Sequence, residues 1–239
     1  MLLAVFVVIA GIAGAFAGSL INAAAVRLPV DLDPIGPPVC PSCSELQPRR
    51  GMYPFWTGTC ASCGHSDRRQ RLATEIAATV LSMVSIAIFH ATLLGLATAL
   101  FTLLLLLILR IDWQHHLIFT ITIIPGIVLA LALAVLRSPG ALLSATLAGV
   151  GAGLLFGLFF ALAILIYRKQ ALGFGDILLA VLIGTMTGVR AIVPALFIGM
   201  VLAALGGLLL ILIGARTRRD YIPYGAYLCA GTIIALFLR

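Results

Sequence analysis

Two aspartates in this sequence lie where a charged side chain is costly. Asp112 stands at the end of an apolar run, in Leu109-Arg110-Ile111-Asp112-Trp113, and Asp176 begins another, in Gly173-Phe174-Gly175-Asp176-Ile177. Ionisable groups at such positions are functional candidates, because burying them without a purpose is unfavourable. Two carboxylates held close together share one proton, so that one can act as base toward a trapped water, as in an aspartic protease.

The glycines that precede Asp176 suit this chemistry. Gly173 and Gly175 carry no side chain, so they permit a turn into a helix and let an extended peptide backbone approach Asp176 closely. A helix N-terminus at Asp176 would also favour its anionic form. Because such a pair titrates as a unit, the sequence does not assign the role of base to either aspartate.

Two other interpretations of the aspartates are open at this point. Asp112 could pair with the neighbouring Arg110 while Asp176 caps a helix, and both residues would then be structural. Proton-coupled transporters also carry membrane carboxylates, although usually near the midplane and on broken helices.

Four cysteines form a second candidate site. Cys40-Pro41-Ser42-Cys43 and Cys60-Ala61-Ser62-Cys63 are separated by 16 residues, which fits the spacing of a four-thiolate zinc ribbon. Four thiolates close the coordination shell, so the zinc is expected to be structural. A pair of disulfides is the alternative, and it would be expected only if this segment were exported.

The other titratable side chains have simpler interpretations. Glu75 is expected to start a helix or to pair with Arg71, and Cys229 is expected to be a buried packing residue. His65 is expected to be a solvated loop residue, and His115 and His116 are expected to lie at the membrane interface.

The elements that position these residues must be membrane helices. Of the 239 residues, 62% are hydrophobic and 10% are charged, with a mean hydropathy of +1.20. This composition excludes an ordinary soluble enzyme. The net charge of +7 does not indicate a nucleic-acid partner, because the basic residues are few and scattered between apolar runs.

Apolar runs long enough to cross a bilayer predict the number of spans. They cover residues 2–25, 73–109, 117–136, 141–167, 177–213 and 221–238. Two of them have double length and are expected to turn near residues 90–95 and 188–194, which gives eight spans.

The basic residues predict the orientation. With the N-terminus outside, the loops at 27–72, 110–116, 168–176 and 214–220 contain 12 of the 15 basic residues and face the cytoplasm. Both aspartates then lie at the same depth on the cytoplasmic face. The cysteines lie in a reducing compartment, which favours zinc over disulfides.

The sequence therefore predicts an all-α polytopic membrane protein with about eight transmembrane helices and a small zinc-ribbon-like cytoplasmic insert. Residues 1–26 are expected to form the first transmembrane helix and residues 27–72 the zinc-binding insert. Residues 73–239 are expected to form a helical membrane core, which is an aspartic protease core on the catalytic interpretation of its two aspartates.

Taken together, these features resemble the type IV prepilin peptidases, which are membrane aspartic proteases of the G-x-G-D type. Asp112, preceded by Ile111, matches the first catalytic aspartate by position. The other matches run over nearly the whole chain: Gly18-Ser19-Leu20-Ile21-Asn22 with Arg27-Leu28-Pro29, the two C-x-x-C pairs, Arg71-Leu72-Ala73-Thr74-Glu75, Gly173-Phe174-Gly175-Asp176, and Ile222-Pro223-Tyr224-Gly225-Ala226. The chain departs from the family at Ile118-Phe119-Thr120, where a proline usually follows the isoleucine.

The resemblance implies a bacterial inner-membrane endopeptidase with Asp112 and Asp176 as its catalytic pair. It would cleave the basic leader of prepilins or pseudopilins, from a type IV pilus, competence or type II secretion system, after a glycine on the cytoplasmic side. Many members of the family then methylate the new N-terminus with S-adenosylmethionine, an activity associated with the cysteine-bearing insert.

The leader of such a substrate would be positively charged. Because the insert is itself rich in arginine, a basic leader must be attracted by acidic residues such as Asp31, Asp33 or Glu75, or by anionic lipid. The competing class is a proton-coupled transporter or an assembly scaffold with a structural zinc insert. Substitution of either aspartate by Asn distinguishes these functional classes, because a protease would lose turnover whereas a scaffold would keep working.

Overall fold

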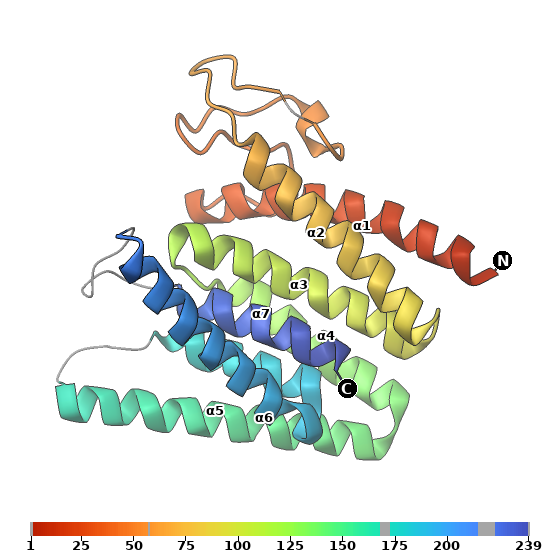
Figure 1. Cartoon of the computed structure of the whole chain (residues 1–239), viewed down its shortest axis with the longest axis vertical. Coiled ribbons are helices and arrows are strands. Elements are labelled where there is room, and N and C mark those ends of the chain that lie inside the picture. Colours follow the sequence, from red (N-terminus) through yellow and green to blue (C-terminus); the bar gives the residue numbers. More distant parts are fainter. Residues whose placement is uncertain (1, 57, 168–172, 215–222, 239) are drawn as a thin grey trace. The chain divides into compact units, whose positions relative to one another are not determined.

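Most of the described part of the chain is α-helical, and its segment 28–67 is mainly loop (Figure 1). A computed structural model describes residues 2–56, 58–167, 173–214 and 223–238. Within these ranges the helices are α1 (Leu2–Arg27), α2 (Arg68–Phe89), α3 (Leu93–His115), α4 (Thr120–Arg137), α5 (Pro139–Tyr167), α6 (Phe174–Leu212) and α7 (Tyr224–Phe237). Two short 3-10 helices, η1 (Leu28–Val30) and η2 (Arg49–Met52), lie in the insert, so the all-α class is confirmed for the described residues.

The number of membrane spans differs from the prediction. Helices α1 to α6 are long and apolar enough to cross a membrane, whereas α7 has only 14 residues. The predicted run from 221 begins, in the described residues, at Pro223, which is the N-cap residue of α7. The count of eight transmembrane helices is therefore not confirmed.

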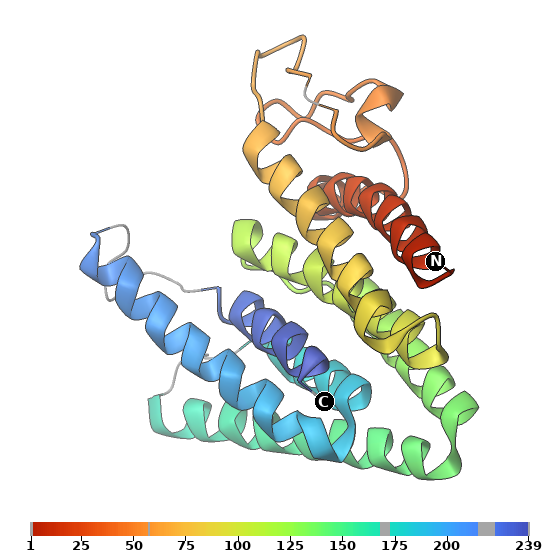
Figure 2. The same cartoon turned by 45° about the vertical axis from the view of Figure 1, so that its right-hand side comes forward.

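A glycine interrupts the longest helix. At 39 residues, a straight α6 would be about 58 Å long, roughly twice the thickness of the hydrocarbon layer. Gly188 adopts φ 68° and ψ 177° inside it, a conformation that glycine reaches without a steric penalty. The chain changes direction at this point (Figure 2). The break lies within the stretch 188–194 where the sequence predicts a turn.

The other predicted turn and the start of α4 are also described. Helix α2 ends at Phe89 and α3 begins at Leu93, which confirms a turn within residues 90–95. Helix α4 begins at Thr120 even though the proline usual in the family is absent. Several residues of the predicted loops lie outside the described ranges, namely Arg168, Lys169, Arg216, Arg218, Arg219 and Asp220. Ile222, in the predicted last apolar run, and Arg239 also lie outside them.

The chain divides into two compact units, Met1–Ile111 and Asp112–Arg239. In the first unit, α1 packs on α2 through small residues. A Cβ atom on Gly18 would lie 2.7 Å from the Cα of Glu75, and one on Gly14 would lie 2.7 Å from the carbonyl oxygen of Ala78. The two backbones thus approach closely, as is common where membrane helices pack.

In the second unit, α6 packs against α4, α5 and α7, and Gly184 supplies a test of this packing. A Cβ atom there would collide with the backbone of Ala148 and Gly149, which cannot rotate away. We expect Gly184→Ala to lower the free energy of unfolding by about 1–3 kcal/mol. Gly151→Ala is the matched control, because a Cβ atom on Gly151 meets open space. Thermal unfolding in detergent measures both, and equal shifts would contradict the packing described.

Candidate active site and metal cluster

Asp112, in the last turn of α3, is held by the start of another helix. Its side chain is buried, and its Oδ2 accepts a hydrogen bond of 2.7 Å from the backbone N–H of Ala226, 114 residues further along the chain. Ala226 is the third residue of α7, so its N–H is one of those that a helix leaves open at its N-terminus. The start of α7 therefore holds the carboxyl group of Asp112 in place.

Gly225 allows this close approach. A Cβ atom on Gly225 would lie 3.1 Å from Oδ2 of Asp112 and 3.0 Å from Cδ1 of Ile118. A Cβ atom on Gly175 would likewise lie 2.8 Å from Cβ of Ile118. Ile118 thus packs against both the glycine turn before Asp176 and the start of α7.

Asp176, the third residue of α6, closes the turn that precedes it. The backbone N–H of Gly173 donates to Oδ2 of Asp176 at 3.0 Å, and the backbone N–H of Asp176 donates to the carbonyl oxygen of Gly173 at 3.1 Å. The first bond is the half of a capping box in which the N3 side chain accepts the N-cap N–H, and the second closes the turn through the backbone, because Gly173 has no side chain. The carboxylate, which is half-buried, is therefore oriented by its own helix.

The same unit gathers further polar side chains around the two aspartates. Asp112 lies within electrostatic range of Asp176, and the hydroxyl of Tyr224 lies within range of Asp176. Cys229 is fully buried, as predicted, and its thiol lies within range of both carboxylates. Tyr224 and Ala226 stand in the segment that resembles I-P-[FY]-G-P, but no sequence pattern indicates that its backbone would bind Asp112.

The interpretation in which Asp112 pairs with Arg110 is wrong. The Nη2 atom of Arg110 lies 2.9 Å from Oδ2 of Asp67, and its Nη1 donates to Oε1 of Gln70 at 2.7 Å. Asp67 therefore has a specific partner and is more than a solvated loop residue.

The four cysteines of the insert converge as predicted. Their Sγ atoms all lie within 4.8 Å of one another, and the pairs Cys40/Cys63 and Cys43/Cys60 are separated by 3.6 Å. Tetrahedral zinc with bonds of about 2.3 Å would hold sulfurs about 3.8 Å apart, so the geometry fits this metal. The cysteines are free rather than paired in disulfides.

The two cysteine turns have the same backbone. In each, the residue after the second cysteine, Ser44 or Gly64, has a positive φ, 58° or 69°, and its N–H donates to the carbonyl oxygen of the first cysteine. One buried cysteine, Cys40 or Cys60, and one exposed cysteine come from each turn. The cluster is thus built from two equivalent knuckles.

The electrostatics of the cluster also favour a cation. The backbone N–H of Cys63 lowers the pKa of the Cys60 thiol to about 6. The backbone N–H of Glu45 lowers the pKa of Cys43, but hydrogen bonding with the neighbouring thiols raises it to about 12. The thiol of Cys60 thus loses its proton readily, whereas the thiol of Cys43 keeps its proton next to its neighbours. A divalent metal ion would offset the repulsion between the thiolates.

Comparison with known proteins relates these sites to one family. The model of the type IV leader peptidase family matches residues 99–211, a segment that contains both aspartates. Over 229 residues the chain is 30% identical to the prepilin leader peptidase/N-methyltransferase of Bacillus subtilis (strain 168), covering 93% of this chain and 90% of that protein. The chain belongs to the type IV leader peptidase family. No solved structure gives a significant match.

Membership decides between the functional classes that the sequence leaves open. This leader peptidase is an enzyme, so the transporter and scaffold interpretations are set aside. The resemblance derived from the motifs is confirmed.

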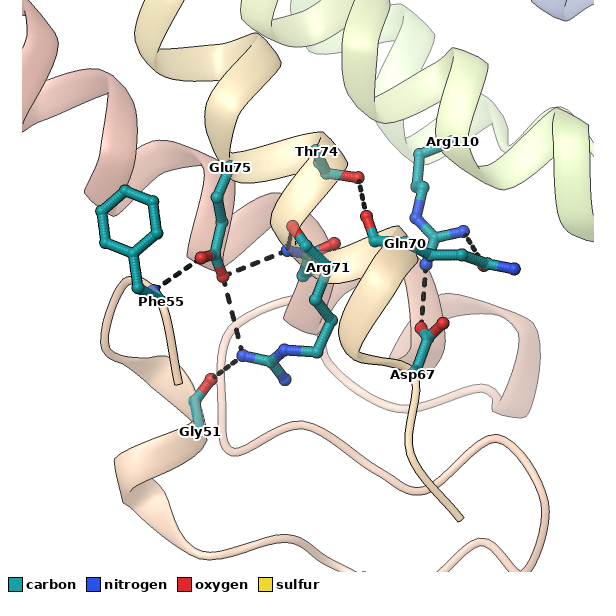
Figure 3. A network of polar contacts seen from close by, with 9 residues as sticks. Gly51, Phe55, Asp67, Gln70, Arg71, Thr74, Glu75 and Arg110 are labelled. Atoms are coloured by element: carbon teal, nitrogen blue, oxygen red, sulfur yellow. Dashed lines mark hydrogen bonds and ion pairs between the residues drawn. The ribbon is translucent and has the colours of Figure 1, made fainter. Parts of the chain in front are cut away.

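Glu75 is a buried residue that binds other parts of the chain, and it is not available to recognise a leader (Figure 3). Its Oε2 accepts a bond of 2.6 Å from the backbone N–H of Phe55, and its Oε1 accepts from Nδ2 of Asn22 at 3.3 Å and lies 3.8 Å from Nη2 of Arg71. The expected pairing with Arg71 is confirmed. Recognition of a basic leader by Glu75 is excluded, because the side chain is fully buried.

Arg71 extends this network to the insert. Its Nη2 donates to the carbonyl oxygen of Gly51 at 2.7 Å (Figure 3). Its guanidinium also lies 5.1 Å from the centre of the Trp56 ring. Asn22 also donates to the carbonyl oxygen of Arg71, at 3.0 Å. The insert is thereby fastened to α1 and α2 through buried polar contacts.

Proposed function

We propose that this leader peptidase is an integral-membrane aspartic endopeptidase with Asp112 and Asp176 as its catalytic pair. The observation that carries the proposal is that Asp112, at the end of α3 and bonded to the start of α7, lies within electrostatic range of Asp176, at the start of α6. Its substrates are prepilins or pseudopilins, whose basic leader it removes after a glycine. The name of the Bacillus subtilis relative supports this substrate class.

Hydrolysis requires one aspartate to be ionised and the other protonated. The ionised carboxylate removes a proton from a water molecule, whose oxygen attacks the carbonyl carbon of the substrate glycine. The protonated carboxyl gives its proton to the carbonyl oxygen, and a tetrahedral diol forms. Collapse of the diol breaks the C–N bond: the carboxyl that took the proton from water gives it to the departing amine, and a diol hydroxyl gives its proton to the other carboxylate. The pair then again holds one shared proton.

We further propose that the new N-terminus is methylated with S-adenosylmethionine. The support is the name of the relative, which includes N-methyltransferase, and an alignment that covers 93% of this chain. Leader recognition would depend on Asp31, Asp33 or anionic lipid, since Glu75 is buried.

The experiment that tests this function is mass spectrometry of a prepilin incubated with the purified protein. We expect loss of the leader with a new N-terminus directly after the glycine, and a further mass increase of one methyl group when S-adenosylmethionine is added. An intact prepilin would contradict the peptidase proposal, and cleavage without the methyl increase would contradict the methylation proposal alone.

We propose that the ion held by the cysteine cluster is zinc and that it is structural. Cys40→Ser is expected to lower zinc affinity by at least about 100-fold, because a ligand of a closed four-sulfur shell is lost. Elemental analysis of the purified protein measures the effect. Cys229→Ser is the matched control, because Cys229 is distant in the chain and should keep about one zinc per chain. Full zinc content in Cys40→Ser would contradict the assignment.

We propose that the protein lies in the bacterial inner membrane with its N-terminus outside. The insert and both aspartates then face the cytoplasm, where most basic residues lie. Reporter fusions after Gly64, Trp113 and Lys169 are expected to give a cytoplasmic signal, and a fusion after Ser138 an external one. An external signal at Gly64 or Trp113 would contradict this orientation.

A further inference from the structure

A buried arginine, two residues before Asp112 in the chain, has no role in the chemistry proposed above. Arg110 is 7% exposed, although it carries a charge at the end of a membrane helix. Its Nη2 lies 2.9 Å from Oδ2 of Asp67 and its Nη1 lies 2.7 Å from Oε1 of Gln70 (Figure 3). These bonds join residues 43 and 40 positions apart, so they connect two different helices.

The partners of Arg110 both belong to the start of α2. Asp67 is the N-cap residue of α2, and Gln70 lies in its first turn. Because the guanidinium is planar and binds two acceptors with two different nitrogens, both its position and its rotation are restrained. The last turns of α3 are thereby fastened to the first turn of α2, within the unit Met1–Ile111.

Two short stretches of chain connect this contact to the sites described above. Arg110 precedes Asp112 by two residues on the same continuous helix, α3. Asp67 follows Cys63, the last cysteine of the cluster, by four residues. Residues within one turn of a helix move together, so a displacement of Arg110 would be transmitted to Asp112.

We propose that Arg110 is a positioning residue of the peptidase site: its bonds to Asp67 and Gln70 fix the last turn of α3 and thereby hold Asp112 in its productive position. This inference rests on the proposed catalytic role of Asp112. A displacement of about 1 Å in a catalytic group can cost about 100-fold in rate, so a restraint of this kind has a measurable effect.

The test is steady-state cleavage of a prepilin by the purified, metal-loaded, full-length protein. Arg110→Met removes both bonds at similar volume, and Asp67→Ala removes one acceptor. Both are expected to lower kcat by about 10- to 100-fold with KM changed by less than about 3-fold. Asp67→Asn keeps an oxygen that can accept from Arg110 and is expected to retain kcat within about 3-fold. Arg137→Met, at the exposed end of α4, is the matched control.

The outcomes separate positioning from a merely structural role. Wild-type kcat per folded molecule in Arg110→Met or Asp67→Ala, even with a lower melting temperature, would overturn the proposal. If these variants do not fold, Arg110→Lys, which keeps the charge but loses the planar fork, decides: reduced kcat with unchanged metal content supports the proposal, and unchanged kcat overturns it. An active Asp112→Asn would instead mean that the proposed function itself has failed.

Discussion

Asp112→Asn and Asp176→Asn are each expected to lower the kcat of prepilin cleavage by about 1,000-fold or more. General acid and base catalysis contributes about 100- to 10,000-fold, and the mechanism requires both carboxyl groups. Asn has nearly the same shape, but it can neither take a proton from water nor give one to the carbonyl oxygen. The amide oxygen of Asn at 112 can still accept the N–H of Ala226, so the start of α7 should stay in place.

Single-turnover cleavage with the enzyme in excess over a purified prepilin measures this loss. Glu45→Gln is a suitable control, because Glu45 is an exposed acidic residue of the insert and should retain wild-type kcat. Each variant should also keep its melting temperature and metal content. Cleavage by either aspartate variant within about 10-fold of the wild type would make that residue structural.

The largest effect on stability is expected at Glu75. In Glu75→Ala, the backbone N–H of Phe55 and the guanidinium of Arg71 each lose a buried acceptor. Removal of one member of a buried charged pair typically costs about 3–5 kcal/mol, because the remaining charge is left uncompensated. We expect Glu75→Ala to lower the free energy of unfolding by this amount and to release the insert first.

Denaturant unfolding in detergent and hydrogen exchange at the amide of Phe55 measure these two consequences. Glu75→Gln should have a smaller effect, because its amide oxygen can still accept the N–H of Phe55. Glu45→Ala, on the exposed side of the insert, should stay within about 0.5 kcal/mol of the wild type. An equally small change for Glu75→Ala would contradict the anchoring role described here.

Features governed by local spacing could be predicted from the sequence. The two C-x-x-C turns bring their own thiols together, so the cluster of Cys40, Cys43, Cys60 and Cys63 needed only a second knuckle of the same type nearby. Hydropathy located six long helices, because a bilayer demands continuous apolar runs. It overestimated α7, in which only 14 residues are helical after Pro223.

Contacts between residues distant in the chain could not be predicted in this way. The bond from Ala226 to Asp112 spans 114 residues, and the pair of Asp67 with Arg110 spans 43. Glu75 was a candidate for leader recognition because a basic leader must be attracted by acidic residues, of which the sequence has few. The fold instead buries it against the N–H of Phe55, a backbone group that no sequence pattern marks.

The measurement that tests the central claim most directly is a double-mutant cycle of the two aspartates in single-turnover prepilin cleavage. If Asp112 and Asp176 act as one catalytic pair, the variant carrying both Asp112→Asn and Asp176→Asn should be no slower than either single variant, because the first substitution already removes the function of the pair. A double variant slower by the product of the two single effects would show that the aspartates act independently, and the shared-proton mechanism would be wrong.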